Sequence, residues 1–122
     1  MRLRRFFALI LVAINLGPYN GYAQETRIIK GQILTQESSP VPGLAVILLG
    51  TDNAVATDLN GRFELTVEDV GEAYVHLFGL DLEIFLKFEE GETSKTVNLG
   101  DWKKLKKDNK KISNEWTARK PN

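Results

Sequence analysis

The sequence predicts an all-β fold, a seven-stranded antiparallel β-sandwich of the immunoglobulin-like kind, over residues 24–100. Three observations support this prediction. Short apolar runs alternate with a period of two, and turn-forming segments separate them at spacings of about ten residues. No amphipathic helical stretch lies between the runs. Parallel strands would need long crossover connections, usually helices, and the chain leaves no room for them.

The first three strands are predicted at residues 26–34, 43–50 and 53–57. In "TRIIKGQIL", Ile29 and Ile33 fall on one face with Gly31 between them. The run "GLAVILLG" is apolar on both faces, which is typical of a central strand that is covered twice. "NAVAT" is the third strand, and a short turn follows it.

The last four strands are predicted at residues 62–67, 73–78, 82–88 and 95–99. "RFELTV" alternates cleanly, with Phe63, Leu65 and Val67 directed inward. "AYVHLF" ends at a Gly-Leu-Asp break, and "LEIFLKF" then alternates in the same way. "KTVNL" closes the series with Val97 and Leu99 on the inner face.

Residues 1–23 resemble a secretory signal peptide rather than part of the sandwich. Three arginines precede the apolar run "FFALILVAINL", and Gly21-x-Ala23 offers a small-residue cleavage site before Gln24. The alternative is a transmembrane anchor, but this run is shorter than the roughly 20 residues that cross a membrane. We therefore expect a cleaved signal and an exported protein.

The chain contains no cysteine. Disulfides, thiolate metal sites, a cysteine nucleophile and a lipid-modified cysteine are therefore excluded. An exported domain of this size without disulfides fits a bacterial envelope better than a small eukaryotic secreted scaffold. We expect it in the periplasm or associated with the outer membrane, and not as a lipoprotein.

The charge is unevenly distributed although the net charge is zero. Residues 24–100 hold five Lys/Arg and thirteen Asp/Glu, a net charge of −8, whereas residues 101–122 hold eight Lys/Arg and three Asp/Glu, a net charge of +5. In this basic tail Trp102, Leu105, Ile112 and Trp116 fall within a sector of roughly 80° on a helical projection. The tail is therefore either a short amphipathic helix or a solvated, partly disordered end. Its candidate binding residues are Trp102, Lys103, Lys104, Lys106, Lys107 and Trp116.

The residues give no pattern of a catalytic site. The one histidine, His76, lies inside a predicted strand, where a packed or half-exposed side chain is the ordinary outcome. No nucleophile–base motif, phosphate loop, dinucleotide motif or HExxH metal motif occurs. The acidic body would repel nucleic acid. We expect no enzyme activity, no cofactor, no metal and no nucleic-acid partner.

The stretch "TDLNGRFEL" could be a calcium loop or a hairpin turn. A calcium loop of the EF-hand type needs its glycine at position six, but counted from Asp58 the glycine, Gly61, comes at position four and the cationic Arg62 at position five. In a hairpin Asp58 would accept backbone hydrogen bonds and Gly61 would adopt a positive φ. We predict a hairpin between "NAVAT" and "RFELTV".

Three segments together resemble the carboxypeptidase-regulatory-like domain of Bacteroidetes envelope proteins, as found at the N-terminus of TonB-dependent receptors. They are "IIKGQIL", "PVPGLAVILLGTD" and "ATDLNGRFEL". The residues that carry the likeness are Gly31, Pro42, Gly43, Gly50, Asp58, Gly61, Phe63, Leu65 and Gly79. The resemblance implies a transthyretin-like (prealbumin) sandwich without a catalytic centre, which serves as a structural or interaction module. It carries no transport role over to this chain.

These observations favour a non-catalytic, exported interaction module that binds an envelope protein through a sandwich face or an edge strand. An outer-membrane receptor or transporter component is the expected kind of partner. The alternative is a protein that binds an anionic glycan or membrane surface through its tryptophan- and lysine-rich tail.

Overall fold

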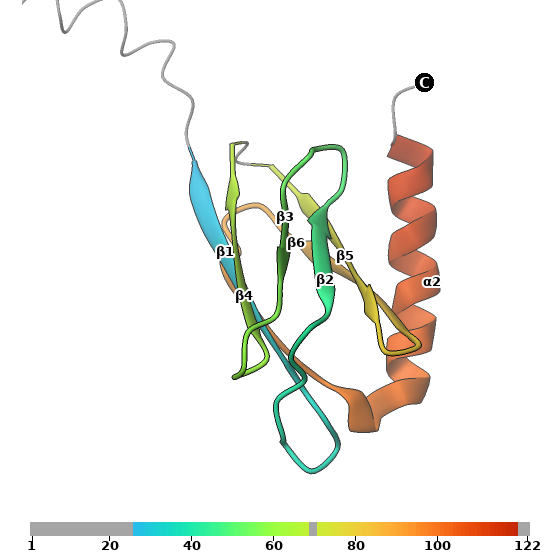
Figure 1. Ribbon diagram of the computed structural model, residues 1–122. Coiled ribbons are helices and arrows are strands. Elements are labelled where there is room, and N and C mark those ends of the chain that lie inside the picture. The colour runs from blue at the N-terminus through green and yellow to red at the C-terminus, as the bar shows by residue number, and fades with distance from the viewer. Residues whose placement is uncertain (1–25, 69–70, 120–122) are drawn as a thin grey trace, which may run out of the picture.

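The computed structural model describes residues 26–68 and 71–119. The predicted signal peptide lies outside the described residues. Seven strands are followed by a short 3-10 helix and one long α-helix (Figure 1). The elements are β1 (Arg27–Leu34), β2 (Ala45–Leu48), β3 (Ala54–Ala56), β4 (Arg62–Val67), β5 (Ala73–Gly79), β6 (Leu82–Phe88), β7 (Ser94–Asn98), η1 (Leu99–Asp101) and α2 (Trp102–Arg119).

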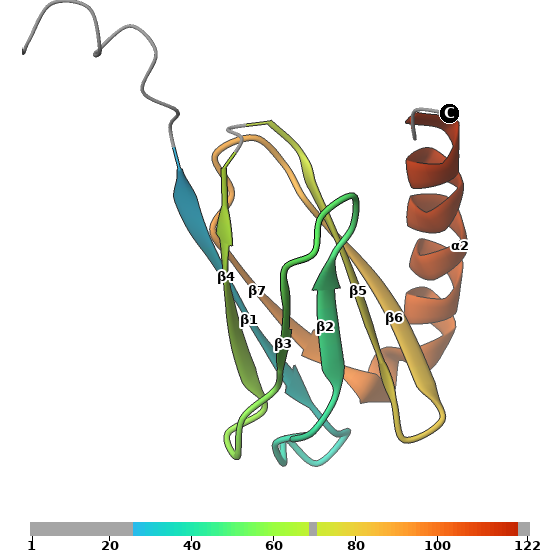
Figure 2. The same ribbon diagram turned by 45° about the horizontal axis from the view of Figure 1, so that its top comes forward.

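The strands form two sheets that enclose one apolar core, which confirms the predicted two-sheet β architecture (Figure 2). One sheet has the order β4-β1-β7 and the other the order β3-β2-β5-β6. The inward positions are those that the period-two pattern predicts, because successive side chains of a strand point to opposite faces. Phe63, Leu65 and Val67 of β4 are all buried, whereas Arg62, Glu64 and Thr66 are exposed.

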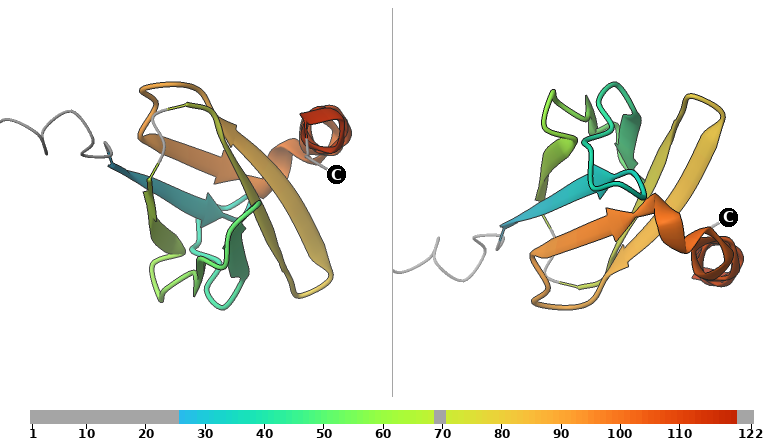
Figure 3. Two further views of the ribbon diagram at one scale, coloured as in Figure 1. Left: turned by 90° about the horizontal axis from the view of Figure 1, so that it is seen from above. Right: turned by 90° about the horizontal axis from the view of Figure 1, so that it is seen from below.

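The sequence predicts an antiparallel sandwich, and this prediction is wrong for one pair of strands. β1 pairs antiparallel with β4 but parallel with β7, with Ile33 opposite Val97. The reason is the connection: β6 belongs to the other sheet, and the chain returns from it to the end of the sandwich where β1 begins (Figure 3). Lys30 N–H donates to Thr93 O at 2.8 Å where β7 enters. A strand that crosses between sheets needs no helix to run parallel to its new neighbour.

The predicted hairpin between β3 and β4 is also wrong, because these strands lie in different sheets. The predicted turn is present and carries the chain from one sheet to the other. Gly61 N–H donates to Asp58 O at 2.8 Å, and Asp58 Oδ1 accepts from the N–H groups of Asn60 and Arg62 at 2.8 and 2.9 Å. Gly61 has a φ of 71°. The Asp58 side chain therefore shapes the turn, as the hairpin interpretation required, but the turn joins two layers.

A glycine in β1 accommodates the largest side chain of β4. Gly31 lies opposite Phe63, and a Cβ at Gly31 would meet the Phe63 ring at 2.2 Å. The phenyl ring thus covers the glycine backbone and fills the space that a side chain would occupy. This close approach explains the central glycine of the first strand.

The basic tail is helical over Trp102–Arg119 and packs beside β6. Viewed along the strands, α2 lies on the side of the sandwich that carries β6 and β7, away from β3 and β4 (Figure 3). Leu105 contacts the core cluster, and Ile112 and Trp116 are half-buried. Of the two alternatives for the tail, the amphipathic helix is the one observed. Within the described part of the chain, no helix is long and apolar enough to cross a membrane.

Candidate functional site

The single histidine lies in a packed environment on the outer face of the four-stranded sheet. The His76 ring stacks on Phe85 with ring centroids 4.4 Å apart, and His76 Nε2 lies 3.0 Å from Glu83 Oε2. The Phe78 ring is also close, with its centroid 4.9 Å from that of His76. Among residues 26–68 and 71–119, no group of three or more His, Asp or Glu side chains is placed to hold a metal ion.

The densest group of polar side chains joins α2 to the outer face of β5 and β6. Lys87 Nζ lies 2.8 Å from Glu115 Oε2 of the helix and 3.1 Å from Glu72 Oε2. Arg119 of the helix forms a second ion pair with Glu72. The hydrogen bond from Lys87 lowers the pKa of Glu115, and the same hydrogen bond raises the pKa of Lys87. Both shifts favour the charged pair, so this cluster holds the helix on the sheet.

An aromatic contact completes the same interface. The Trp116 ring of α2 lies 5.5 Å from the Tyr74 ring of β5. The Arg119 guanidinium also lies over the Tyr74 ring, 5.6 Å from its centre. Burial raises the pKa of the Tyr74 hydroxyl, which lies 3.4 Å from Glu115 Oε2. The C-terminal half of α2 is therefore attached by both charge and ring packing.

The helix also covers the free edge of β6. The side chain of Asn109 accepts from Phe85 N–H at 2.8 Å and donates to Glu83 O at 2.7 Å. These are the two groups that one residue of a neighbouring parallel strand would satisfy. An edge strand exposes unpaired backbone groups that invite another chain, and covering the edge removes that risk. Asn109 thus satisfies two backbone groups on this edge of the four-stranded sheet.

Asn53 and Asp58 also engage the edge of β4 that faces β3. Asn53 Nδ2 donates to Thr66 O at 3.3 Å, and Asp58 N–H donates to Arg62 O at 2.9 Å. The register places the backbone groups of alternate β4 residues on this edge. Both ends of the β4 edge are therefore engaged within the chain.

The outer edge of β3 differs from the edges of β6 and β4 in its hydrogen bonding. Leu48 N–H donates to Asn53 O, so the alternation directs the N–H and C=O groups of Ala54 and Ala56 away from β2. No hydrogen bond within the described residues reaches these outward groups. All three residues of β3 are exposed, and none carries a charge. β3 therefore presents a short, bare edge with small apolar side chains.

Apolar side chains on the adjoining sheet surface extend this edge. Ala54 and Ala56 lie opposite Ile47 and Ala45 of β2, and Ala45 lies opposite Phe78 of β5. Phe78 is 39% exposed, and Ile47 is half-buried. We call Ala54, Ala56, Ile47, Ala45 and Phe78 the β3 surface. It combines free backbone groups with an apolar floor.

The predicted tail residues do not form one site. Trp102 is 38% exposed at the start of α2, whereas Trp116 is half-buried against Tyr74. At 1.5 Å per residue the two tryptophans are about 21 Å apart along the helix. The helix exposes four of the predicted residues, Lys103, Lys104, Lys106 and Lys107. Of these, Lys106 lies next to Trp102 on the helical projection. The structure therefore separates a docking tryptophan from an exposed one.

The remaining residues singled out in the sequence are architectural in the structure. Gly43, Gly50, Gly61 and Gly79 all have positive φ, and Pro42 precedes the first of them. Gly50 lies against the Trp116 ring, to which a Cβ would come within 3.0 Å. Leu65 belongs to the core. These residues place the strands and the helix.

Sequence reasoning missed Asn109, Ala54 and Ala56. Asn109 had a detectable signal, since on the helical projection it falls inside the apolar sector between Trp116 and Trp102. A polar residue in such a stripe indicates a specific buried partner. The edge position of β3 had no signal, because strand order is not encoded in the alternation. No protein-family model matches the chain, and no curated protein matches it.

Proposed function

We propose that the protein is a non-catalytic interaction module of the bacterial envelope, which binds a partner protein by adding an extended segment of that partner to the edge of β3. The observation that carries the proposal is the bare β3 edge beside the β3 surface. Backbone hydrogen bonds supply affinity in strand addition, and pockets for alternate side chains supply specificity. The resemblance to carboxypeptidase-regulatory-like domains and the predicted signal peptide support a partner in the envelope and a prealbumin-type sandwich as the scaffold.

The contrast between edges supports this choice. Asn109 covers β6, and Asn53 and Asp58 engage β4, whereas β3 carries neither a covering side chain nor a charge of its own. Proteins commonly blunt edge strands with lysine, proline or bulges. The shortness of β3 limits how many hydrogen bonds it can offer, so the apolar surface beside it must supply part of the affinity.

The test introduces charge at the edge and compares it with the same charge elsewhere. The edge variant carries Ala54→Lys and Ala56→Lys, and the control carries Thr96→Lys and Ala118→Lys, which are also exposed positions. Tagged forms are expressed in the native host, and bound envelope proteins are cross-linked and identified by mass spectrometry. Thermal unfolding verifies that each form is folded.

The proposal requires one partner that the wild type and the control capture and that the edge variant loses. Cross-links should map to β3. A partner that the edge variant retains, or that both variants lose equally, would overturn the proposal. Cross-links only between copies of this chain would also overturn it, since they would show self-association instead of partner binding.

A further inference from the structure

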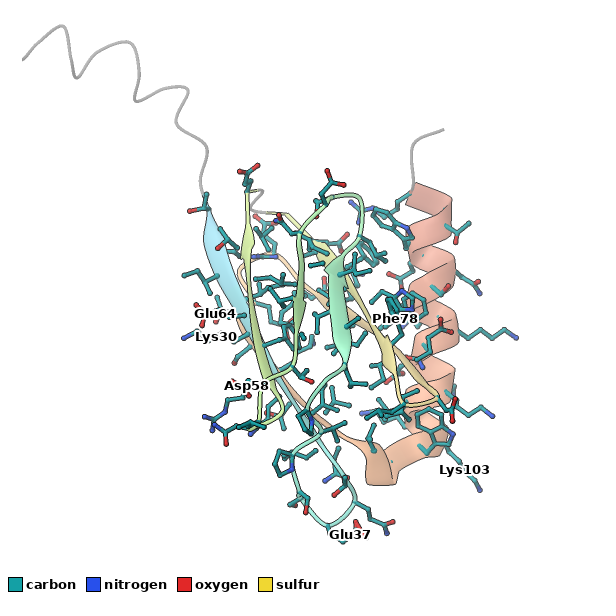
Figure 4. All side chains as sticks on the ribbon, viewed as in Figure 1. Lys30, Glu37, Asp58, Glu64, Phe78 and Lys103 are labelled. Carbon is teal, nitrogen blue, oxygen red and sulfur yellow. The ribbon has the colours of Figure 1, made fainter. Side chains whose placement is uncertain are left out.

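The outward face of the N-terminal half of α2 is a cationic surface. On a helical projection its only charged residues are lysines, all of them exposed, and the helix acids Asp108 and Glu115 fall outside this sector. We call these residues the lysine face: Lys103, Lys104, Lys106, Lys107, Lys110 and Lys111. None of them forms a salt bridge within the described residues. Figure 4 shows Lys103 directed away from the sandwich.

This arrangement works against the stability of the helix. Positive charge near a helix N-terminus opposes the helix dipole, and α2 has no acidic residue in its first turn. Six pairs of lysines stand three or four residues apart, where like charges repel. Departures from local stability rules are expected at functional sites. The lysine face is therefore better explained by a ligand than by the fold.

The chemistry of the face indicates a diffuse anionic partner. Lysine is a flexible point charge, whereas arginine recognises individual phosphates and carboxylates with two parallel hydrogen bonds. The one arginine of the described helix, Arg119, faces Glu72 on the sheet instead. No aromatic side chain lies among these lysines, and Trp102 stands only at the border of the face, which leaves no platform between the lysines for a sugar or base to stack on. Such a face suits a surface of smeared charge.

We propose that the lysine face binds the surface of an anionic phospholipid membrane. Trp102 lies at the border of the face, one helical turn from Lys106, and is 38% exposed. Tryptophan favours the interfacial region of a membrane, and clustered lysines on a helix attract anionic headgroups. Residues 24–100 carry a net charge of −8, so repulsion turns the sandwich outward and presents α2 to the membrane.

The test measures co-sedimentation of the full chain, in its mature form if the signal is cleaved, with vesicles. Vesicles of phosphatidylglycerol and phosphatidylcholine are compared with vesicles of phosphatidylcholine alone, at low and high salt. The helix variant carries Lys107→Glu and Lys110→Glu. The control carries Lys30→Glu and Arg62→Glu, two exposed cations of the three-stranded sheet, so that both variants change the net charge equally.

We expect binding only to anionic vesicles, and weaker binding at high salt. The helix variant should bind about 30-fold more weakly or worse, since each lysine near an anionic surface contributes about fivefold. The control should bind within a few-fold of wild type. Because the helix variant removes lysine repulsion, its thermal stability should not fall, and a loss of binding cannot then be ascribed to unfolding.

A spectroscopic arm reports on Trp102 directly. In a Trp116→Phe background Trp102 is the sole tryptophan, and its emission should shift to the blue when anionic vesicles bind. Equal loss of binding in both charge variants would overturn the proposal, because vesicle binding would then depend on the net charge of the protein and not on the lysine face. Binding to heparin or duplex DNA with no binding to anionic vesicles would overturn it as well, and would assign the face to a soluble polyanion.

Discussion

Replacement of Gly61 by alanine tests the turn that joins the two sheets. Gly61 has a φ of 71°, and a Cβ there would stand 2.5 Å from Ile33 O and 2.9 Å from Val41 N. Both atoms belong to the backbone, so no side-chain rotation can make room. The substitution must move either the turn or the strand β1 beside it.

The expected loss can be worked out from these contacts. A left-handed backbone costs an alanine about 1–2 kcal/mol. Displacement would also weaken two hydrogen bonds, from Ile33 N–H to Gly61 O at 2.8 Å and from Val41 N–H to Ile33 O at 3.0 Å. Each is worth about 1 kcal/mol. The lower entropy of the unfolded alanine chain returns about 0.4–1 kcal/mol, so the free energy of unfolding should fall by about 2–3 kcal/mol.

Gly91→Ala is the matched control. Gly91 has a φ of 82°, but nothing lies within 4 Å of its Cβ position. Its substitution therefore reports backbone strain alone, with an expected loss of about 1 kcal/mol. Urea unfolding of both variants gives the difference. If Gly61→Ala lost no more than Gly91→Ala, the close approach of the turn to Ile33 and Val41 would be refuted.

Three further outcomes follow from the helix interface and the β5–β6 turn. Asn109→Ala should lower the free energy of unfolding by about 1–3 kcal/mol and speed hydrogen exchange at Phe85 N–H, whose acceptor it removes; unchanged exchange would contradict the edge contact. The pKa of Glu115 is lowered in the folded protein, so the Lys87–Glu115 pair stabilises the fold above the ordinary pKa of 4.5, and this stabilisation is lost as the pH falls below that value. The stability of Glu115→Gln should therefore lack this loss in acid unfolding, and acid profiles identical to those of the wild type would count against the pair. Leu80 is 69% exposed with a φ of 53°, so Leu80→Asn should raise the melting temperature by several degrees, about 1 kcal/mol of stability, and a lower melting temperature would show that Leu80 makes a contact that exposure conceals.

The strands were predictable because burial in a sheet depends on local alternation. The inward residues of β4 and β6 are those that the period-two pattern selects, and they need no knowledge of their neighbours. Strand pairing depends on where the chain travels between strands. Val97 shows that β7 faces the core, but nothing in "KTVNL" indicates that its neighbour is β1 or that the pair is parallel. A tight turn at Asp58 likewise fits a hairpin or a crossing between sheets equally well.

The candidate surfaces were predictable only where they depend on one element. The lysine face is a property of a single helix, so the sequence contains it once the tail is helical. The β3 surface combines residues of β2, β3 and β5, and its bare edge exists only because β3 is the last strand of its sheet. The same is true of Asn109, whose partners on β6 precede it by more than twenty residues.

The two faces of α2 make opposite contributions to its stability, and this links the fold to the proposed membrane contact. Lysine repulsion over six pairs costs roughly 1–3 kcal/mol at low salt, and no residue of the helix is fully buried. The helix is therefore held by Asn109, by the Lys87–Glu115 pair and by the packing of Leu105 and Trp116. An anionic surface neutralises the repulsion without touching these contacts, because they face the sheet. By reciprocity, whatever binds the lysine face also stabilises the docked helix and so keeps Asn109 on the edge of β6, while the bare edge of β3 stays available to a partner at the membrane.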